Sequence, residues 1–267
     1  DPEKEALSRY LIDPRFNVAA IVGWGGSGKS QLVRSWIESL SPTYGGSTRI
    51  FGWSFYAQGS APGAAVSSDE FFARAFEIFG GRPDAPDALE LANALARSIR
   101  AAPTLVVLDG LEPLLDGKGE IRDLALKYLV NELTASINGL CVVTTRPPFA
   151  PDGETLVRIE LAPLKPEAGA ALLRAHKLKG TDTELQGLSE TLQGHPLSLA
   201  ILANYIRDAW RGEIWRASTE LRQMLKEDDG RLDRLLDSYA RHLSHDQSRV
   251  LNAIALFDRP ATIADIQ

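Results

Sequence analysis

The sequence predicts an α/β fold with a mainly parallel sheet, followed by an all-helical region. Strand and helix patterns alternate up to residue 161, and only helical patterns follow Pro163. The strand patterns are apolar throughout, as in residues 105–108 and 140–143, instead of alternating between apolar and polar. A strand that is apolar on both faces is covered by helices on both faces, and this arrangement is typical of parallel sheets.

Apolar periodicity places five strands and the helices between them in the first part of the chain. The strands are expected at residues 16–22, 49–56, 104–108, 140–144 and 156–161. The helices are expected at residues 6–12, 31–40, 72–79, 92–99 and 121–128.

Beyond Pro163, helical spacing recurs without any strand pattern. The helices expected there fall at residues 171–178, 185–192, 199–206, 232–243 and 250–257. We therefore expect an α/β domain over residues 1–162, a helical domain over residues 163–243 and the start of a further domain over residues 244–267. Because the chain opens on Asp1 and a further helical pattern is interrupted at Gln267, we expect a piece of a longer protein.

Composition excludes several classes of function. The net charge of −6 gives the chain no overall attraction to nucleic acid or to an anionic membrane. No apolar run approaches the roughly 20 residues of a membrane span, and the polar N-terminus is not a signal peptide. The single cysteine, Cys141, allows neither an intrachain disulfide nor a cysteine metal cluster, and we expect it to be a buried thiol. These features predict a cytoplasmic protein.

A phosphate-binding motif occupies residues 23–30, whose sequence Gly-Trp-Gly-Gly-Ser-Gly-Lys-Ser lies between a predicted strand and a predicted helix. Glycines let successive N–H groups point at phosphate oxygens, and the helix adds its positive N-terminal end. Lys29 is expected to reach the β- and γ-phosphates, and Ser30 to place its hydroxyl on Mg²⁺. A chance glycine-rich turn is the alternative, which the strand-before, helix-after context disfavours. The residues predicted to bind ATP or ADP here are Gly25, Gly26, Ser27, Gly28, Lys29, Ser30 and Gln31.

Two acidic residues follow the predicted strand at residues 104–108. Asp109 ends that strand, where a nucleotide-binding protein of this type presents a carboxylate to the magnesium shell. Glu112 lies three residues further on and is a candidate to orient or deprotonate an attacking water. A solvated loop acid is the alternative for Glu112.

Arg146 follows the predicted strand at residues 140–144. A cation at the carboxyl edge of a parallel sheet sits where ligands bind, so Arg146 is a candidate to contact the γ-phosphate and sense its loss. A surface arginine ahead of Pro147 and Pro148 is the alternative. The predicted catalytic set is Lys29, Asp109, Glu112 and Arg146, with Ser30 and Asp109 as the metal ligands.

The order and spacing of these motifs resemble the STAND class of signalling NTPases, the bacterial relatives of NB-ARC and NACHT proteins. Residues 109–112, Asp-Gly-Leu-Glu, are similar to the NACHT acidic pattern but depart from it at Pro113. Residues 144–146, Thr-Thr-Arg, resemble the NB-ARC sensor strand. Residues 194–197, Gly-His-Pro-Leu, resemble the G-x-P-L motif of the helical domain that follows the NTPase core. The resemblance covers the chain from about Tyr10 to Gln267.

The resemblance implies a sheet order of 5-1-4-3-2, a helical lid and a winged helix that begins within residues 244–267. It also implies that Pro196 packs near the adenine with His195 and Leu197 beside it, which adds Pro196 and Leu197 to the nucleotide-binding set. The same Gly-His-Pro run is also typical of a helix start, because glycine ends a helix and proline suits the first turn of the next.

The function implied by the resemblance is a switch in which ATP and ADP exchange and slow hydrolysis control oligomerisation and effector activation, with bacterial antiphage defence as one setting for it. Self-association in the ATP state and effector and sensor domains in the parent chain are the implied partners; neither a membrane nor direct nucleic-acid binding is expected. A steady-turnover AAA+-like ATPase is an alternative, although that class usually has Glu where this chain has Gly110. An ATP-dependent transcription regulator, with its reading head outside this chain, is a further alternative.

Overall fold

The computed structural model describes residues 1–55, 68–81, 86–147, 155–216, 237, 239–241 and 243–255. The chain divides into two compact units. The α/β unit contains Asp1–Trp24 and Lys29–Leu161, and the helical unit contains Ala162–Phe257 together with Gly25–Gly28 of the glycine-rich loop.

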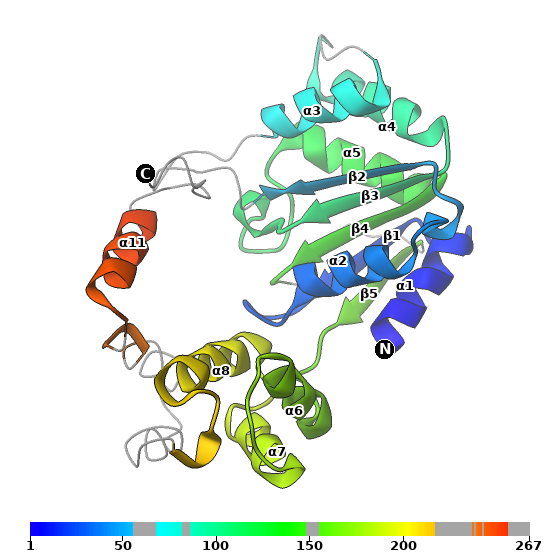
Figure 1. The fold of residues 1–267 in the computed structure, drawn as a ribbon. Helices are drawn as coiled ribbons and strands as arrows, with labels where there is room; N and C mark the ends of the chain where they lie inside the picture. Colours follow the sequence, from blue (N-terminus) through cyan, green and yellow to red (C-terminus); the bar gives the residue numbers. More distant parts are fainter. Residues whose placement is uncertain are drawn as a thin grey trace. The chain divides into compact units, whose positions relative to one another are not determined.

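Five parallel strands form the sheet of the α/β unit (Figure 1). They are β1 (Val18–Val22), β2 (Arg49–Ser54), β3 (Thr104–Asp109), β4 (Gly139–Thr145) and β5 (Leu156–Glu160). Their order across the sheet is β2-β3-β4-β1-β5, and every neighbouring pair is parallel. This confirms the predicted parallel sheet and the order 5-1-4-3-2, which is the same order read from the other edge.

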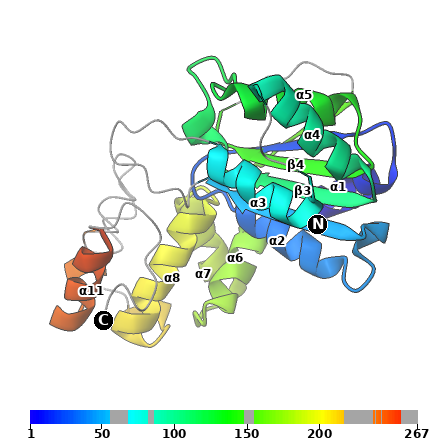
Figure 2. The same cartoon turned by 90° about the horizontal axis from the view of Figure 1, so that it is seen from above.

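Helices cover both faces of this sheet. Within its described residues, the α-helices of this unit are α1 (Pro2–Ile12), α2 (Lys29–Ser39), α3 (Asp69–Phe79), α4 (Ala88–Arg100) and α5 (Leu124–Ala135). Figure 1 shows α3, α4 and α5 on one face and α1 and α2 on the other, and Figure 2 shows the first group from above.

The strands are apolar on both faces because alternate side chains enter two different cores. In β4, Cys141 and Val143 pack with residues of α3, α4 and α5, whereas Leu140 and Val142 pack with residues of α1 and α2. All four side chains are wholly buried. The absence of polar alternation in the sequence therefore reflects two covered faces, as predicted.

Several predicted boundaries were wrong, and three of them have a local physical reason. Helix α1 begins at Pro2, four residues before the predicted start, because a proline and two acids suit a first helical turn. Ile121 is outside α5 and pairs with Leu115 in an antiparallel bridge. Leu178 is outside α6 (Pro166–Ala175), since Lys177 adopts φ +70° beyond the helix end.

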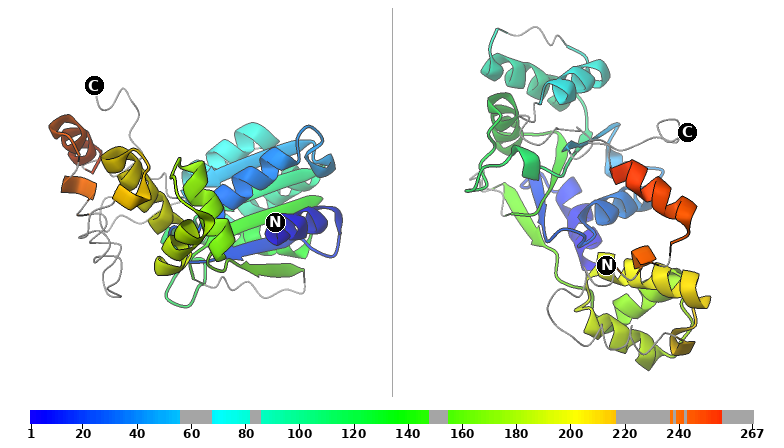
Figure 3. Two further views of the ribbon diagram at one scale, coloured as in Figure 1. Left: turned by 60° about the horizontal axis from the view of Figure 1, so that its bottom comes forward. Right: turned by 90° about the vertical axis from the view of Figure 1, so that its left-hand side faces the viewer.

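The helical unit has a core of its own. It contains α6, α7 (Asp182–Thr191), α8 (Pro196–Trp210), the 3₁₀ turn η4 (Ile214–Arg216) and α11 (His245–Ala255). Figure 3 shows α6, α7 and α8 gathered together, and their buried leucines share one cluster with Ile206. A Cβ at Gly169 would collide with the Ser189 side chain, so glycine allows α6 and α7 to approach closely. Most of the helix predicted at 232–243, and residues 256–267 of the expected winged helix, lie outside the described residues.

No helix within the described residues is long and apolar enough to cross a membrane.

The buried cysteine provides a probe of the sheet. Burial raises the pKa of the Cys141 thiol to about 12, so the thiol is protonated and shielded at neutral pH. We expect a thiol reagent to label the native protein only through unfolding, and the urea-denatured protein rapidly and with one equivalent. Labelling rates across a urea series, compared with unfolding followed by circular dichroism, test this. Rapid labelling without urea would contradict the burial.

Candidate functional site

The glycine-rich loop leaves β1 and ends at the first turn of α2. The N–H of Gly23 donates to the carbonyl of Thr145 at 3.2 Å, which ties the start of the loop to the end of β4. Gly26 and Gly28 adopt φ +76° and φ +93°. These left-handed conformations favour glycine, so these two positions of the loop suit a residue that lacks a Cβ.

Lys29 is held against the start of this loop. Its side chain is mostly buried, and Nζ donates to the carbonyls of Gly23 at 2.7 Å and Trp24 at 3.0 Å. Desolvation is the largest influence on the pKa of Lys29 and lowers it, while the Glu112 carboxylate acts in the opposite direction. An ammonium in this setting lacks much of its water and gains from an anionic ligand.

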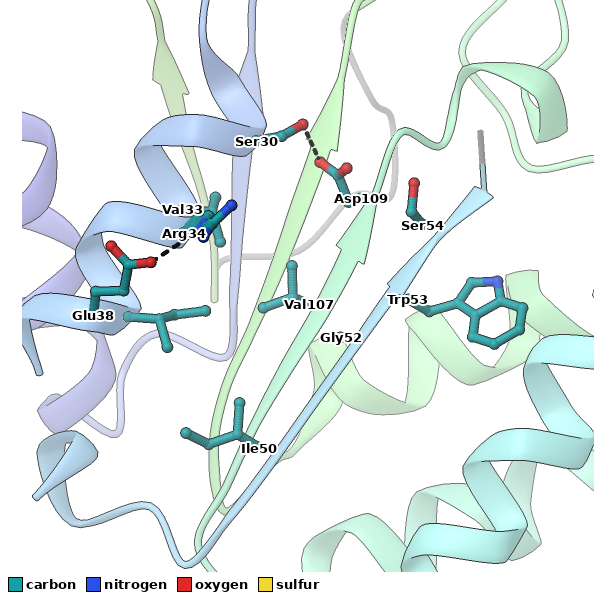
Figure 4. A pocket seen from close by; sticks show the side chains of 11 residues that line it. Ser30, Val33, Arg34, Glu38, Ile50, Gly52, Trp53, Ser54, Val107 and Asp109 are labelled. Carbon is teal, nitrogen blue, oxygen red and sulfur yellow. Dashed lines mark hydrogen bonds and ion pairs between the residues drawn. The ribbon is translucent and has the colours of Figure 1, made fainter. Parts of the chain in front are cut away.

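Ser30 and Asp109 meet at the carboxyl edge of the sheet (Figure 4). The Ser30 hydroxyl donates to Oδ1 of Asp109 at 2.7 Å, and the Thr144 hydroxyl donates to the same oxygen at 2.6 Å. A hydroxyl and a carboxylate are oxygen ligands of the kind that Mg²⁺ takes beside phosphates. The two predicted metal ligands are therefore adjacent.

Thr144 is a site residue whose role sequence reasoning missed. Besides donating to Asp109, its Oγ1 accepts the buried N–H of Gly110 at 2.8 Å. Leu108 is paired with Val143, so the residues that follow them meet across the two strand ends. The signal in the sequence was a threonine at the end of one buried strand and an aspartate at the end of another.

Glu112 opens a 3₁₀ turn, Glu112–Leu114, after the chain reverses at Gly110 with φ +73°. Its side chain is 15% exposed, and both carboxylate oxygens are buried without a hydrogen-bond partner among the described residues. Nε of Arg146 lies 3.9 Å from Oε1. Glu112 is therefore not a solvated loop acid. A buried carboxylate that lacks hydrogen bonds is costly, and a water or ligand in this position would satisfy it.

A cavity of about 470 Å³ extends from Ser30 and Asp109 over the exposed part of the sheet beside α2. Val33, Ile37, Ile50 and Val107 supply apolar walls, and the Arg34–Glu38 ion pair of 3.0 Å lies along the helix side (Figure 4). The cavity is open because β2 is the edge strand and Gly52 has no side chain to fill it.

The helical unit holds the middle of the glycine-rich loop. Nε2 of His195 lies 2.9 Å from the carbonyl of Gly25, and the N–H of Leu197 donates to the carbonyl of Gly26 at 3.2 Å. His195 is also the N-cap of α8, which begins at Pro196. The expected proline start is confirmed. The expected glycine stop is not, because α7 ends at Thr191 and the left-handed residue directly after its cap is Gln193, at φ +52°, with Gly194 next at φ +63°.

The structure thus groups the predicted residues within each unit. In the α/β unit, Lys29, Ser30, Asp109, Glu112 and Arg146 gather around the end of β3. In the helical unit, Gly25 and Gly26 contact the first turn of α8, which contains Pro196 and Leu197. Ser27 has a buried hydroxyl with no partner among the described residues, and Gln31 is exposed. Contact of any of these residues with a nucleotide or a metal ion stays a prediction.

The hydrogen bonds of Thr144 to Gly110 and Asp109 can be tested by substitution. Thr144→Val keeps the volume but removes the acceptor of the Gly110 N–H and a donor to Asp109. We expect a stability loss of about 1–3 kcal/mol in urea unfolding, since a buried donor is left unpaired. Thr144→Ser, which keeps the hydroxyl, should lose much less. Equal stability of Thr144→Val and the wild type would mean that these bonds do not hold the end of β3.

The chain matches no model of a known protein family, and no curated protein matches it. Solved structures do match. A STAND protein with a tetratricopeptide repeat sensor from Pyrococcus horikoshii has a TM-score of 0.67 and 17% identity, covering 99% of this chain and 35% of that protein. The chain therefore spans about a third of its length.

Two further structures share the fold. A Walker-type ATPase of Pyrococcus abyssi has a TM-score of 0.50 and 15% identity, covering 95% of this chain and 79% of that one. The structure of Drosophila ORC bound to DNA has a TM-score of 0.51 and 16% identity, covering 95% of this chain and 65% of that one. Sheet order, loop geometry and these likenesses agree that the chain has the P-loop NTPase fold and is similar in structure to a STAND protein.

Proposed function

We propose that the chain is the nucleotide-binding part of a signalling switch. It binds ATP and ADP with Mg²⁺, hydrolyses ATP slowly, and couples the exchange of nucleotide to self-association and to activation of an effector elsewhere in its parent protein. The likeness to a STAND protein supports the signalling role, and the residues at the end of β3 support the chemistry. Antiphage defence is one setting in which such a switch would act.

Phosphate binding follows from the loop and Lys29. The loop presents backbone N–H groups, α2 adds its positive N-terminal end, and Lys29 supplies a partly desolvated positive charge. When Mg²⁺ is bound, Ser30 and Asp109 would hold it, and the ion would screen the charge of the phosphate oxygens. Thr144 keeps Asp109 oriented for this role through its 2.6 Å hydrogen bond.

The buried carboxylate of Glu112 is the observation that carries the proposal of hydrolysis. Both of its oxygens lack a hydrogen-bond partner among the described residues, so the group can accept hydrogen bonds from a water without first breaking others. It can orient that water and take its proton as the water attacks the γ-phosphate. Arg146, 3.9 Å from Glu112, is at the same edge and can stabilise the charge of the transferred group.

A switch needs two states that bind ATP and ADP differently. Arg146 and Lys29 can supply that difference, because their contacts to the γ-phosphate vanish once it leaves. A coupling of 1–3 kcal/mol, which is typical of linked sites, corresponds to about a 5- to 150-fold change in affinity between the two states.

A steady-turnover AAA+-like ATPase is the second candidate, and the likeness to the Walker-type ATPase favours it. Its usual acid directly after the strand aspartate does not suit this chain, because the residue there, Gly110, has φ +73°. A glutamate in that conformation would be strained. A transcription regulator would carry its DNA-reading element elsewhere in the parent protein.

Three variants separate binding from hydrolysis. Lys29→Ala should abolish measurable ATP binding, and Asp109→Asn should weaken the dependence of ATP binding on Mg²⁺. Glu112→Gln should retain ATP binding while turnover falls by about 10²–10⁴-fold. Binding is measured by calorimetry and turnover by phosphate release. Glu77→Gln, the same change in an exposed ion pair with Arg74, should leave both intact. Wild-type turnover of many ATP per second would favour the steady-turnover ATPase.

Nucleotide-controlled self-association is tested by measuring the assembly size with each nucleotide. In the presence of its activating signal and Mg²⁺, we expect the parent protein to form a larger assembly with a non-hydrolysable ATP analogue than with ADP. Sedimentation velocity measures this directly. Arg146→Ala should reduce the difference between the two nucleotides. A protein that stays monomeric in both, at every concentration reached, would rule out nucleotide-controlled self-association.

A further inference from the structure

Four successive carbonyls of the glycine-rich loop are each held by a donor. Lys29 Nζ donates to the carbonyls of Gly23 and Trp24, at 2.7 and 3.0 Å. The next two carbonyls contact the first turn of α8: His195 Nε2 lies 2.9 Å from the Gly25 oxygen, and the Leu197 N–H donates to the Gly26 oxygen at 3.2 Å. The backbone from residue 23 to residue 26 therefore has its oxygens committed to the protein.

The direction of a carbonyl sets the direction of the next amide hydrogen. In a planar trans peptide the C=O of one residue and the N–H of the following residue point in opposite directions. Because the Gly25 oxygen is turned toward His195, the Gly26 N–H is turned away from it. Because the Gly26 oxygen is turned toward the Leu197 amide, the Ser27 N–H is likewise turned away from α8. These amides belong to the loop that would receive phosphate.

We propose that His195 is a positioning residue of the phosphate-binding loop. Through its bond to the Gly25 carbonyl, it fixes the Gly25–Gly26 peptide plane so that the Gly26 amide is oriented for a phosphate oxygen before any nucleotide arrives. This rests on the proposed nucleotide binding and deepens it: affinity depends on a side chain of the helical unit that need not touch the ligand.

The partners of His195 determine which ring nitrogen carries the proton. A backbone carbonyl can only accept, so Nε2 must carry the hydrogen that faces Gly25. Nδ1 lies 3.3 Å from the Ser198 backbone nitrogen, where it acts as acceptor, and 2.8 Å from the Ser198 hydroxyl. One imidazole ring therefore has two roles: Nδ1 caps α8, and Nε2 contacts the Gly25 carbonyl of the loop.

The backbone amide of Leu197, the second residue of α8, hydrogen-bonds to the loop. Pro196, at the first helical position, has no N–H, so the Leu197 N–H is the first unsatisfied donor of the helix. It donates to Gly26, and the next donor, Ser198 N–H, goes to His195. The end of the helix is thus satisfied jointly by its own cap and by the loop.

Gly26 lets the loop approach this turn. A Cβ there would lie 2.6 Å from Cβ of Leu197 and 3.1 Å from Cε1 of His195, both closer than ordinary contact. A Cβ at Gly28 would meet nothing within 4 Å, although Gly28 also has a positive φ. Close packing against α8 is therefore specific to the part of the loop that His195 and Leu197 hold.

Two substitutions divide the functions of the two ring nitrogens. His195→Asn keeps an N-cap acceptor near Nδ1 but is too short to reach Gly25. His195→Gln places an amide donor near Nε2 but is a poorer cap. His195→Ala removes both, and His176→Asn is a matched control at another partly buried histidine of the helical unit, 3.4 Å from Asn204.

The experiment has three measurements. Calorimetry gives the affinities for ADP and ATP, thermal unfolding gives the stability, and NMR gives the amide exchange rates of Gly26 and Ser27 in nucleotide-free protein. We expect His195→Asn to weaken both nucleotides by about fivefold to tenfold, the effect of one hydrogen bond, with little change in thermal midpoint and faster exchange at Gly26. His195→Gln should restore affinity and slow exchange at a lower thermal midpoint. His176→Asn should match the wild type in affinity.

Two results would overturn the positioning role: wild-type affinity and wild-type Gly26 exchange in His195→Asn, or loss of affinity that follows thermal stability across all the variants. The exchange measurement needs no nucleotide. If the wild type binds no nucleotide and Lys29→Ala makes no difference, the proposed function fails, while the exchange data still decide whether His195 orders the loop.

Discussion

Burial of the sheet on both faces is the constraint on which the site depends. Because alternate residues of β1, β3 and β4 enter different cores, a slip of one residue between neighbouring strands would put each apolar side chain on the opposite face. The register that avoids this pairs Leu108 with Val143 and Val22 with Thr145. Asp109, Thr144 and the start of the glycine-rich loop then emerge at one edge, so the chemistry of the site is a by-product of core packing.

The same edge concentrates groups that the interior tolerates poorly. Glu112 is a buried carboxylate without hydrogen bonds among the described residues, Lys29 is partly desolvated, and the chain turns at Gly110 with φ +73°. The buried carboxylate and the desolvated ammonium are each unfavourable in isolation, and together they are typical of a place shaped for a ligand. The two cores that support this edge fully enclose their largest side chains, such as Trp36 and Phe71.

Much of this could be predicted from the sequence because its signals are local. Apolar runs gave the strands, glycine spacing gave the phosphate loop, and a strand that ends in Asp109 gave the metal ligand; the sheet order followed from family resemblance. What could not be predicted depends on pairs distant in sequence. The hydroxyl of Thr144 finds Asp109 only after two strands are in register, and the bond from His195 to Gly25 joins residues 170 positions apart. Similarly, Ile121 fits a helical pattern but pairs with Leu115, because Asp123 caps α5 two residues later.

The glycine-rich loop is divided between the two units. Gly25–Gly28 cluster with the helical unit, while their neighbours Trp24 and Lys29 on either side belong to the α/β unit. A ligand bound to Gly25–Gly28 would stabilise the folded helical unit by RT ln(1 + [L]/Kd). The melting temperature of that unit would then depend on the ligand concentration, although most of its chain lies more than 130 residues after the loop.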